Sequence, residues 1–350
     1  MHPTLLAPKS SFRLAAAASC LLGLSLTSAV FGQGCVIARG GGACSMVTDG
    51  SDFLQAGHWQ TGLAFRWFKS HRHFAGAVEQ TQRTREATEV VNKSFFYDFS
   101  ATYAWSERLN LSFTVPYVHH DRSSLYEHLG NSSGQRYSTQ AAGVGDMRVS
   151  ASYWLFNPEN HRNGNLSFGV GIKGPTGEYK ARDTFIRSSG PTERYVDSSI
   201  QPGDGGWGFT AELQGFRRIG GNVSVYGNAF YLFNPKERID ATGFSVPDAY
   251  MARGGFDFVV PRIHGLALSL GGRIEGVPGN DAFGGSRGSR RPGFAVAVEP
   301  GVSFSRGRFS GTLTVPIAVH RNRTTTYGQT KAGDAAFADY TINSSFSVRL

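Results

Sequence analysis

Charged side chains occur among the residues that alternate with aromatic and aliphatic ones in several segments of this sequence. The set contains seven acidic and six basic members, namely Asp98, Asp146, Glu212, Asp257, Glu275, Glu299, Asp339, Arg66, Arg148, Lys173, Arg253, Arg273 and Arg349. Successive side chains of an extended chain point to opposite faces, so these charges would share one face and the apolar side chains the other. A nearly balanced set indicates pairing, because unpaired charges in a narrow interior lose hydration. The charged face is therefore either a structural network or a pore lining that contacts small solutes and selects them by charge.

Two histidine-containing segments could instead supply hydrolytic chemistry, at residues 119–123 (HHDRS) and 320–322 (HRN). A nucleophilic serine needs a histidine within hydrogen-bond reach and an orienting Asn or Asp. Neither segment has the His-x-Ser spacing that places both groups on one face of a strand. His71 and His73 have no evident third metal ligand beside them. A lipid hydrolase or deacylase is therefore the weaker alternative, and the sequence predicts no catalytic residue, metal or cofactor.

The elements that must position the charged residues are clearest at residues 95–118 (FFYDFSATYAWSERLNLSFTVPYV). Apolar side chains occupy alternate positions from Phe95 to Trp105 and, after a turn at residues 106–108, again from Leu109 to Tyr117. This pattern predicts a β-hairpin. Each arm is about ten residues long with aromatic side chains near its ends, as expected for tilted strands that cross a bilayer of roughly 25–30 Å.

The same period of two recurs along the rest of the chain and predicts about twelve strands. They are expected near residues 59–67, 95–105, 109–118, 146–155, 166–173, 207–214, 223–233, 250–260, 266–275, 294–304, 309–319 and 337–350. Short connections alternate with long polar ones, and both ends of the strand region fall on the short side. This alternation predicts a single antiparallel, up-and-down transmembrane β-barrel whose termini face the periplasm.

Composition favours this all-β barrel over other classes. The chain has 350 residues with 45 Gly, 26 Phe and 13 Tyr, and only 17% of its residues are charged. The mean hydropathy is below zero, which excludes a bundle of membrane-spanning helices. A soluble β-sandwich is the alternative, but its strands average about five or six residues. Closure matters because lipid offers no hydrogen-bond partners to an open sheet edge.

The N-terminal region is expected to direct export. Lys9 and Arg13 precede an apolar run at residues 14–30, followed by small residues. This pattern predicts a signal peptide at residues 1–32, cleaved near Gly32 and Gln33, with a membrane anchor as the alternative. Residues 33–56 then form a Gly-rich periplasmic leader. In an oxidising compartment its two cysteines, Cys35 and Cys44, are predicted to form a disulfide, and residues 57–350 form the barrel.

Three short segments carry a resemblance to a known family. They are residues 111–117 (LSFTVPY), 143–149 (GVGDMRV) and 169–177 (GVGIKGPTG). With the strand pattern from residue 57 to residue 350, they resemble bacterial outer-membrane proteins named for a role in the meta-cleavage pathway of phenol degradation and often labelled simply as transporters. The resemblance implies an outer-membrane location and the passage of small hydrophobic or aromatic molecules. It implies no catalytic residues.

The sequence thus predicts a passive channel or transporter in the bacterial outer membrane. The alternatives are a membrane hydrolase and a non-transporting barrel that serves structure or surface recognition through its long loops. The expected partners are a small-molecule solute, outer-membrane lipid with lipopolysaccharide, and the barrel-assembly machinery. The basic segment 284–291 (GGSRGSRR) is predicted to face lipid phosphates, with a solvated loop as the alternative. Nucleic acid is not an expected partner.

Overall fold

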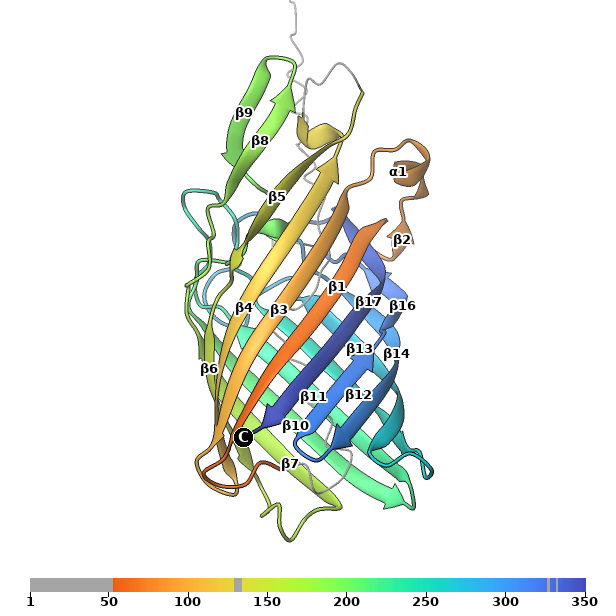
Figure 1. Ribbon diagram of the computed structural model, residues 1–350. Coiled ribbons are helices and arrows are strands. Elements are labelled where there is room, and N and C mark those ends of the chain that lie inside the picture. Colours follow the sequence, from red (N-terminus) through yellow and green to blue (C-terminus); the bar gives the residue numbers. More distant parts are fainter. Residues whose placement is uncertain (1–52, 129–133, 326–327, 332) are drawn as a thin grey trace, which may run out of the picture. The chain divides into compact units, whose positions relative to one another are not determined.

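The computed structural model describes residues 53–128, 134–325, 328–331 and 333–350. The predicted signal peptide, most of the Gly-rich leader and the predicted disulfide between Cys35 and Cys44 lie outside these residues. Figure 1 shows the strands tilted side by side, with the first beside the last.

Within the described residues, a single closed antiparallel sheet has twelve strand positions. Ten of them are each filled by one continuous strand: β1 (Trp59–Ala75), β3 (Val91–Ala104), β4 (Leu109–Ser124), β7 (Gly164–Lys173), β10 (Gly208–Gly220), β11 (Val223–Phe233), β12 (Ala249–Val259), β13 (Leu266–Val277), β14 (Gly293–Arg306) and β17 (Asp334–Arg349). β17 pairs with β1 over almost the whole length of both strands, from Gln60 opposite Arg349 to Ala75 opposite Asp334. The predicted twelve-stranded antiparallel barrel is therefore confirmed.

The other two strand positions are interrupted. β5 (Tyr137–Val144) and β6 (Arg148–Trp154) share one, and β15 (Phe309–Thr314) and β16 (Ile317–Asn322) share the other. The first break lies opposite Pro116 of β4, and the second contains Pro316. Proline cannot donate a backbone hydrogen bond, so each ladder is interrupted beside a residue with no N–H.

The outward face of the barrel is apolar and uncovered. Leu111, Phe168 and Leu268 are 37%, 48% and 50% exposed, and within the described residues no second sheet packs on them. Trp59 and Trp67 lie towards opposite ends of this face on β1, each beside a tyrosine: Trp59 beside Tyr103, and Trp67 beside Tyr340. This is the surface that contact with hydrocarbon requires.

The connections differ strongly in length at the two ends of the barrel. Residues 105–108, 155–163, 221–222, 260–265 and 307–308 form short turns, and both sheet termini lie at the same end, which we call the turn end. At the other end, the loop end, the connections carry β2 (Val78–Glu79), α1 (Thr81–Arg85), η1 (Tyr126–His128), the hairpin of β8 (Arg182–Arg187) and β9 (Gly190–Tyr195), and η2 (Ser198–Ile200). No helix among the described residues has the length and apolar character needed to span a bilayer.

Several strands extend beyond their predicted ends. The periodicity predicts that β1 ends near Trp67 and β4 near Val118, but the strands continue to Ala75 and Ser124. The apolar alternation stops at the earlier positions, while backbone pairing continues with polar side chains. The periodicity therefore marks the apolar band and not the whole strand.

Candidate functional site

Two of the cavities lined by the described residues lie inside the barrel. The turn-end cavity has a volume of about 290 Å³, and its walls carry many hydroxyl groups. They belong to Ser100, Thr102, Ser112, Thr114, Ser150, Ser152, Ser167, Thr210, Ser345 and Ser347. These short side chains alternate with outward apolar ones, so the same period of two that exposes the apolar band gives a polar interior. These uncharged hydroxyl groups can form hydrogen bonds with a solute in the cavity.

The chain that precedes β1 enters the barrel at its turn end. Phe53 packs edge-on against Trp154 with ring centroids 5.0 Å apart, and it lies 5.9 Å from the ring of Phe216. Leu54 joins it in lining the turn-end cavity. Both residues belong to the predicted Gly-rich leader, and no local pattern in the sequence indicates that they fold inward. Phe53 and Leu54 therefore narrow the opening of the cavity at this end.

Five of the predicted charges form one continuous ion-pair chain across β1, β13, β14 and β12. Glu275 accepts from Arg66 at 2.6 Å and from Arg273 at 2.7 Å. Glu299 accepts from Arg253 at 2.9 Å and lies 3.4 Å from Arg273. All five side chains are largely buried, with Glu299 only 1% exposed. Alternating signs let each charge offset the desolvation of its neighbour. We call this set the ion-pair chain.

Four further predicted residues lie near this chain without extending it. Arg148 and Glu212 line the turn-end cavity, and the Arg148 guanidinium lies 5.9 Å from the ring centroid of Phe230. Asp98 is close enough to Arg148 to feel its charge. Asp257 is 2% exposed, and one of its carboxylate oxygens has no hydrogen-bond partner among the described residues. Of the four, Arg148 and Glu212 are the two placed to meet a solute in this cavity.

Lys173 and Asp146 form a separate cluster where β5 and β6 are interrupted. The Lys173 ammonium donates to Asp146 at 3.2 Å, to Asp204 at 2.5 Å and to the backbone oxygen of Gly206 at 2.7 Å. Asp146 also accepts from the backbone N–H groups of Asp204 and Gly177. Two of the family-like segments, 143–149 and 169–177, thus meet here and fix the connection between β7 and β10.

Gly177 in this cluster tolerates no side chain. A Cβ atom there would lie 2.8 Å from the carbonyl carbon of Gly145 and from the Cα of Gly203. Both contacts are with backbone, which cannot rotate away. The close approach explains why glycine occupies this position in the segment GVGIKGPTG.

The last two predicted residues lie elsewhere. Asp339 accepts from Arg72 and Arg321 at 2.8 Å each, beside two register shifts between β1 and β17. Its side chain is 38% exposed. Arg349 lies at the turn end and donates to the backbone oxygen of Gly307. Neither belongs to the ion-pair chain, because strand alternation is broken at Asp339 and the barrel ends at Arg349.

The second cavity lies beneath the long loops and is largely apolar. This loop-end cavity has a volume of about 140 Å³. Its apolar lining includes Phe68, Phe96, Tyr179, Leu232, Ile239, Phe244, Ala249 and Val277. Hydroxyl groups reach it from Ser94, Ser198, Ser199, Ser245 and Ser289. The combination suits a small apolar molecule that carries one or two polar atoms.

An apolar cluster on β11 and β12 borders both cavities. It consists of Phe230, Leu232, Ala249 and Met251, all buried and in mutual contact. Phe230 and Met251 line the turn-end cavity, while Leu232 and Ala249 line the loop-end cavity. We call it the apolar bridge. It offers an apolar molecule a surface that avoids the ion-pair chain.

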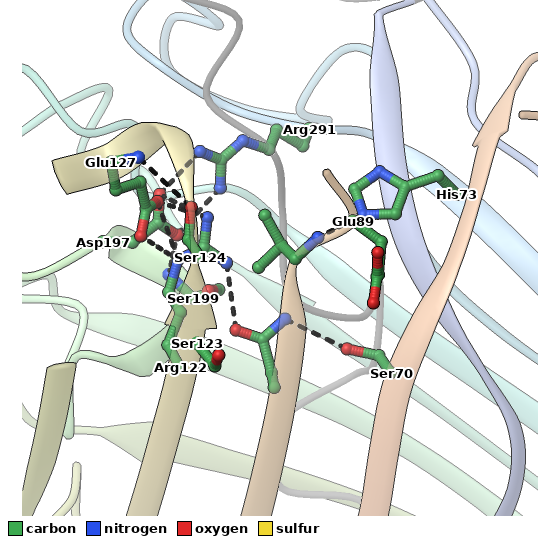
Figure 2. Close-up of polar contacts among 12 residues, drawn as sticks. Ser70, His73, Glu89, Arg122, Ser123, Ser124, Glu127, Asp197, Ser199 and Arg291 are labelled. Carbon is green, nitrogen blue, oxygen red and sulfur yellow. Dashed lines mark hydrogen bonds and ion pairs between the residues drawn. The ribbon is translucent and has the colours of Figure 1, made fainter. Parts of the chain in front are cut away.

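A cluster of paired charges adjoins the loop-end cavity through Arg291, and Figure 2 shows the contacts within the cluster. Both terminal guanidinium nitrogens of Arg291 donate to Asp197, at 2.8 and 2.6 Å. Arg122 is fully buried, binds Glu127 at 2.6 Å and lies 3.6 Å from Asp197. Burial alone would raise the pKa of Asp197, but the charges of Arg122 and Arg291 hold that pKa well below its usual range. We call these four residues the roof cluster; they join β4, η1, η2 and the loop before β14.

Replacing Asp197 with asparagine is expected to loosen the roof cluster. The change leaves Arg122 and Arg291 with less compensating charge, and breaking a buried pair is strongly destabilising. Trypsin should then cleave at Arg182, Arg187 or Arg194 in the β8–β9 hairpin about tenfold faster, as read by gel or mass spectrometry. Because the pKa of Asp197 is lowered in the folded state, its ion pairs contribute their full stability to the folded protein above about pH 4, the ordinary pKa of an aspartate. This contribution is lost only in stronger acid. Equal wild-type protection at pH 6 and pH 8, where trypsin is active and the ion pair is intact, is the expected control.

Two of the three arginines in the basic segment 284–291, Arg290 and Arg291, are buried, while the side chain of Arg287 is exposed, so the predicted contact of this segment with lipid phosphates stays a prediction. Arg291 belongs to the roof cluster, Arg290 forms a bidentate pair with Asp281, and Arg287 binds Glu237 at 2.9 Å. Arg290 and Arg291 also line the loop-end cavity. Three acidic residues from other parts of the loops thus engage arginines that the sequence pattern assigned to lipid phosphates.

The two histidine segments are not brought together. They lie on β4 and β16, which are not neighbours in the sheet. The ring of His120 is buried against Phe96, and that of His320 lies 5.7 Å from Phe294. In the described part of the chain, no group of three His, Cys, Asp or Glu side chains is arranged to hold a metal.

Comparison with solved structures finds other barrels. The chain matches an outer-membrane channel from Pseudomonas putida F1 with a TM-score of 0.56 and 12% identity, over 85% of this chain and 98% of that one. It matches the β domain of the Bordetella autotransporter BrkA with a TM-score of 0.46 and 12% identity, over 84% and 100% of the two chains. The toluene transporter TodX of P. putida gives 0.40 and 10%, over 83% and 89%. No family model and no curated protein matches the chain. The first likeness supports the fold, and family membership stays a prediction.

Proposed function

We propose that this protein is an outer-membrane channel through which small molecules with an apolar body diffuse passively. The uncovered apolar band and the closed ladder support a position in a bilayer. The turn end would face the periplasm and the loop end the exterior. The channel from P. putida F1, similar in fold, is described as an outer-membrane protein. No catalytic step is part of this proposal.

The observation that carries the proposal is the apolar bridge between the two cavities. The neighbouring charges are paired with one another in the ion-pair chain, so an apolar solute would not have to desolvate them. The loop-end cavity, at about 140 Å³, is close to the roughly 150 Å³ apolar cavity that holds one benzene molecule. We infer that single-ring aromatic compounds are the upper size class for this cavity, and its hydroxyl groups suit a phenolic or alcoholic substituent.

Uptake into proteoliposomes tests the proposal. Purified barrel would be reconstituted, and entry of a radiolabelled single-ring phenol or alcohol would be compared with entry of a sugar of similar mass. Faster entry of the aromatic compound than in protein-free liposomes is the expected result. Equal entry with and without protein would refute transport, while preferential sugar entry would identify a hydrophilic pore instead.

Removing the Phe53 side chain is expected to widen the turn end. Phe53→Ala deletes the contacts with Trp154 and Phe216 that hold this segment inside the barrel. Single-channel conductance in a planar bilayer should rise about twofold or more, because the narrowing at this end is relieved. Phe309→Ala, on an exposed side chain of the same end, serves as the control and should leave conductance unchanged. Unchanged conductance in Phe53→Ala would mean that the limiting constriction lies elsewhere.

A further inference from the structure

Two lysines face each other on the outer surface of the barrel. On β1 and β3, the outward register pairs are Phe65 with Tyr97 and Trp67 with Phe95, and the next pair is Lys69 with Lys93. Both lysines are exposed. Like charges directly opposite on paired strands destabilise a sheet. The pair therefore calls for an anion that neutralises it.

The described residues place little negative charge beside Lys69 and Lys93. Neither ammonium has an ion pair within 4 Å among the described residues. Asp121 is the register partner of Lys93 on the opposite side, and its carboxylate accepts from Gln140 at 3.2 Å. Asp339, on the other flank, is engaged by Arg72 and Arg321. One carboxylate beside two lysines leaves a net positive surface.

The height of the pair matches a membrane head-group layer. Trp59 and Trp67 are eight residues apart on β1, about 26 Å along a strand and about 20 Å of height at a tilt of 35–45°. This spans most of an apolar band roughly 25 Å tall. Lys69 lies two residues further, about 5 Å higher. Its ammonium is therefore level with the phosphates of the outer leaflet.

We propose that Lys69 and Lys93 bind a phosphate group of the phosphorylated glycolipid that forms the outer leaflet of the outer membrane. The acyl chains of that lipid would pack on Trp67, Phe95 and the aromatic side chains below them. The inference rests on the proposed outer-membrane position of the barrel and is independent of transport. It names a lipid contact separate from the one predicted for segment 284–291.

The test uses the whole barrel purified in a non-ionic detergent. Diphosphoryl lipid A, a dephosphorylated lipid A and inorganic phosphate would be titrated separately, with occupancy read by native mass spectrometry and unfolding temperature by tryptophan fluorescence. The variant Lys69→Gln with Lys93→Gln should bind diphosphoryl lipid A at least tenfold more weakly. Arg306→Gln with Arg308→Gln removes the same charge at the turn end and should bind as the wild type does.

A second readout separates a binding site from a merely structural pair. Without lipid, the double lysine variant should unfold at a slightly higher temperature than the wild type, because repulsion is removed. With diphosphoryl lipid A, the order should reverse. Equal lipid binding by the lysine variant and the wild type would overturn the proposal. So would equal protection by inorganic phosphate, which would identify a site for free phosphate.

Cell fractionation distinguishes failure of the lipid-site proposal from failure of the outer-membrane proposal. Wild-type protein found in a detergent-free wash would refute the membrane position itself. Wild-type protein found in the outer membrane, together with unchanged lipid binding by the lysine variant, would refute the lipid site alone.

Discussion

Glu299→Gln is expected to lower the free energy of unfolding by about 3–5 kcal/mol. Glu299 is 1% exposed and lies between Arg253 and Arg273, at 2.9 and 3.4 Å. Glutamine keeps the shape of the side chain but removes the carboxylate from between Arg253 and Arg273, of which Arg273 keeps its pair with Glu275. Urea unfolding of the barrel in lipid vesicles, followed by tryptophan fluorescence, measures the difference.

Two variants control for the location of the charge. Glu193→Gln breaks a pair with Arg182 whose side chains are 67% and 47% exposed, so its effect should stay within about 0.5 kcal/mol. Glu299→Met combined with Arg253→Met removes one charge of each sign and should recover part of the loss, because methionine buries without a desolvation cost. If Glu299→Gln has the same free energy of unfolding as the wild type, water screens the charges of the ion-pair chain. The barrel interior around Glu299 would then be a water-filled pore.

The fold was predictable because its main signal is local. Because every second side chain contacts lipid, apolar residues recur with a period of two. Residues 95–118 show this repeat, which can be read without knowing which distant strands pair with them. The same physics explains the errors at strand ends. Above Trp67 the outward face becomes polar while β1 keeps its backbone pairing to β17, so the periodicity stops before the strand does.

The arrangement of the candidate site was only partly predictable. Alternation placed Arg66 and Glu275 on the inward face, but their pairing depends on barrel closure, which brings together residues 209 positions apart. Phe53 and three members of the roof cluster, Glu127, Asp197 and Arg291, lie outside the regular strands, where no periodicity applies. The alternation of Asp339 was also misleading, because two register shifts beside it interrupt the period.

Ala249→Trp is expected to reduce entry of single-ring solutes about tenfold or more. Ala249 belongs to the apolar bridge, lines the loop-end cavity and lies opposite Leu232 in the register of β11 and β12. An indole at this position would occupy much of a cavity of about 140 Å³, and a well-packed wall yields little space to an added ring. The proteoliposome uptake of a radiolabelled phenol measures the effect.

A second alanine on β12 supplies a matched control for this substitution. Ala252 lies three residues further along β12 and, by strand alternation, faces outward with Phe256 and Phe258, which are 47% and 44% exposed. Ala252→Trp adds the same indole to the lipid side, so uptake should remain at the wild-type rate. Comparable loss in both variants would indicate a folding defect, which heat-dependent migration on gels would reveal. If a correctly folded Ala249→Trp barrel takes up the solute at the wild-type rate, solutes do not pass the apolar bridge. Uptake would then continue although the indole obstructs the cavity at that position.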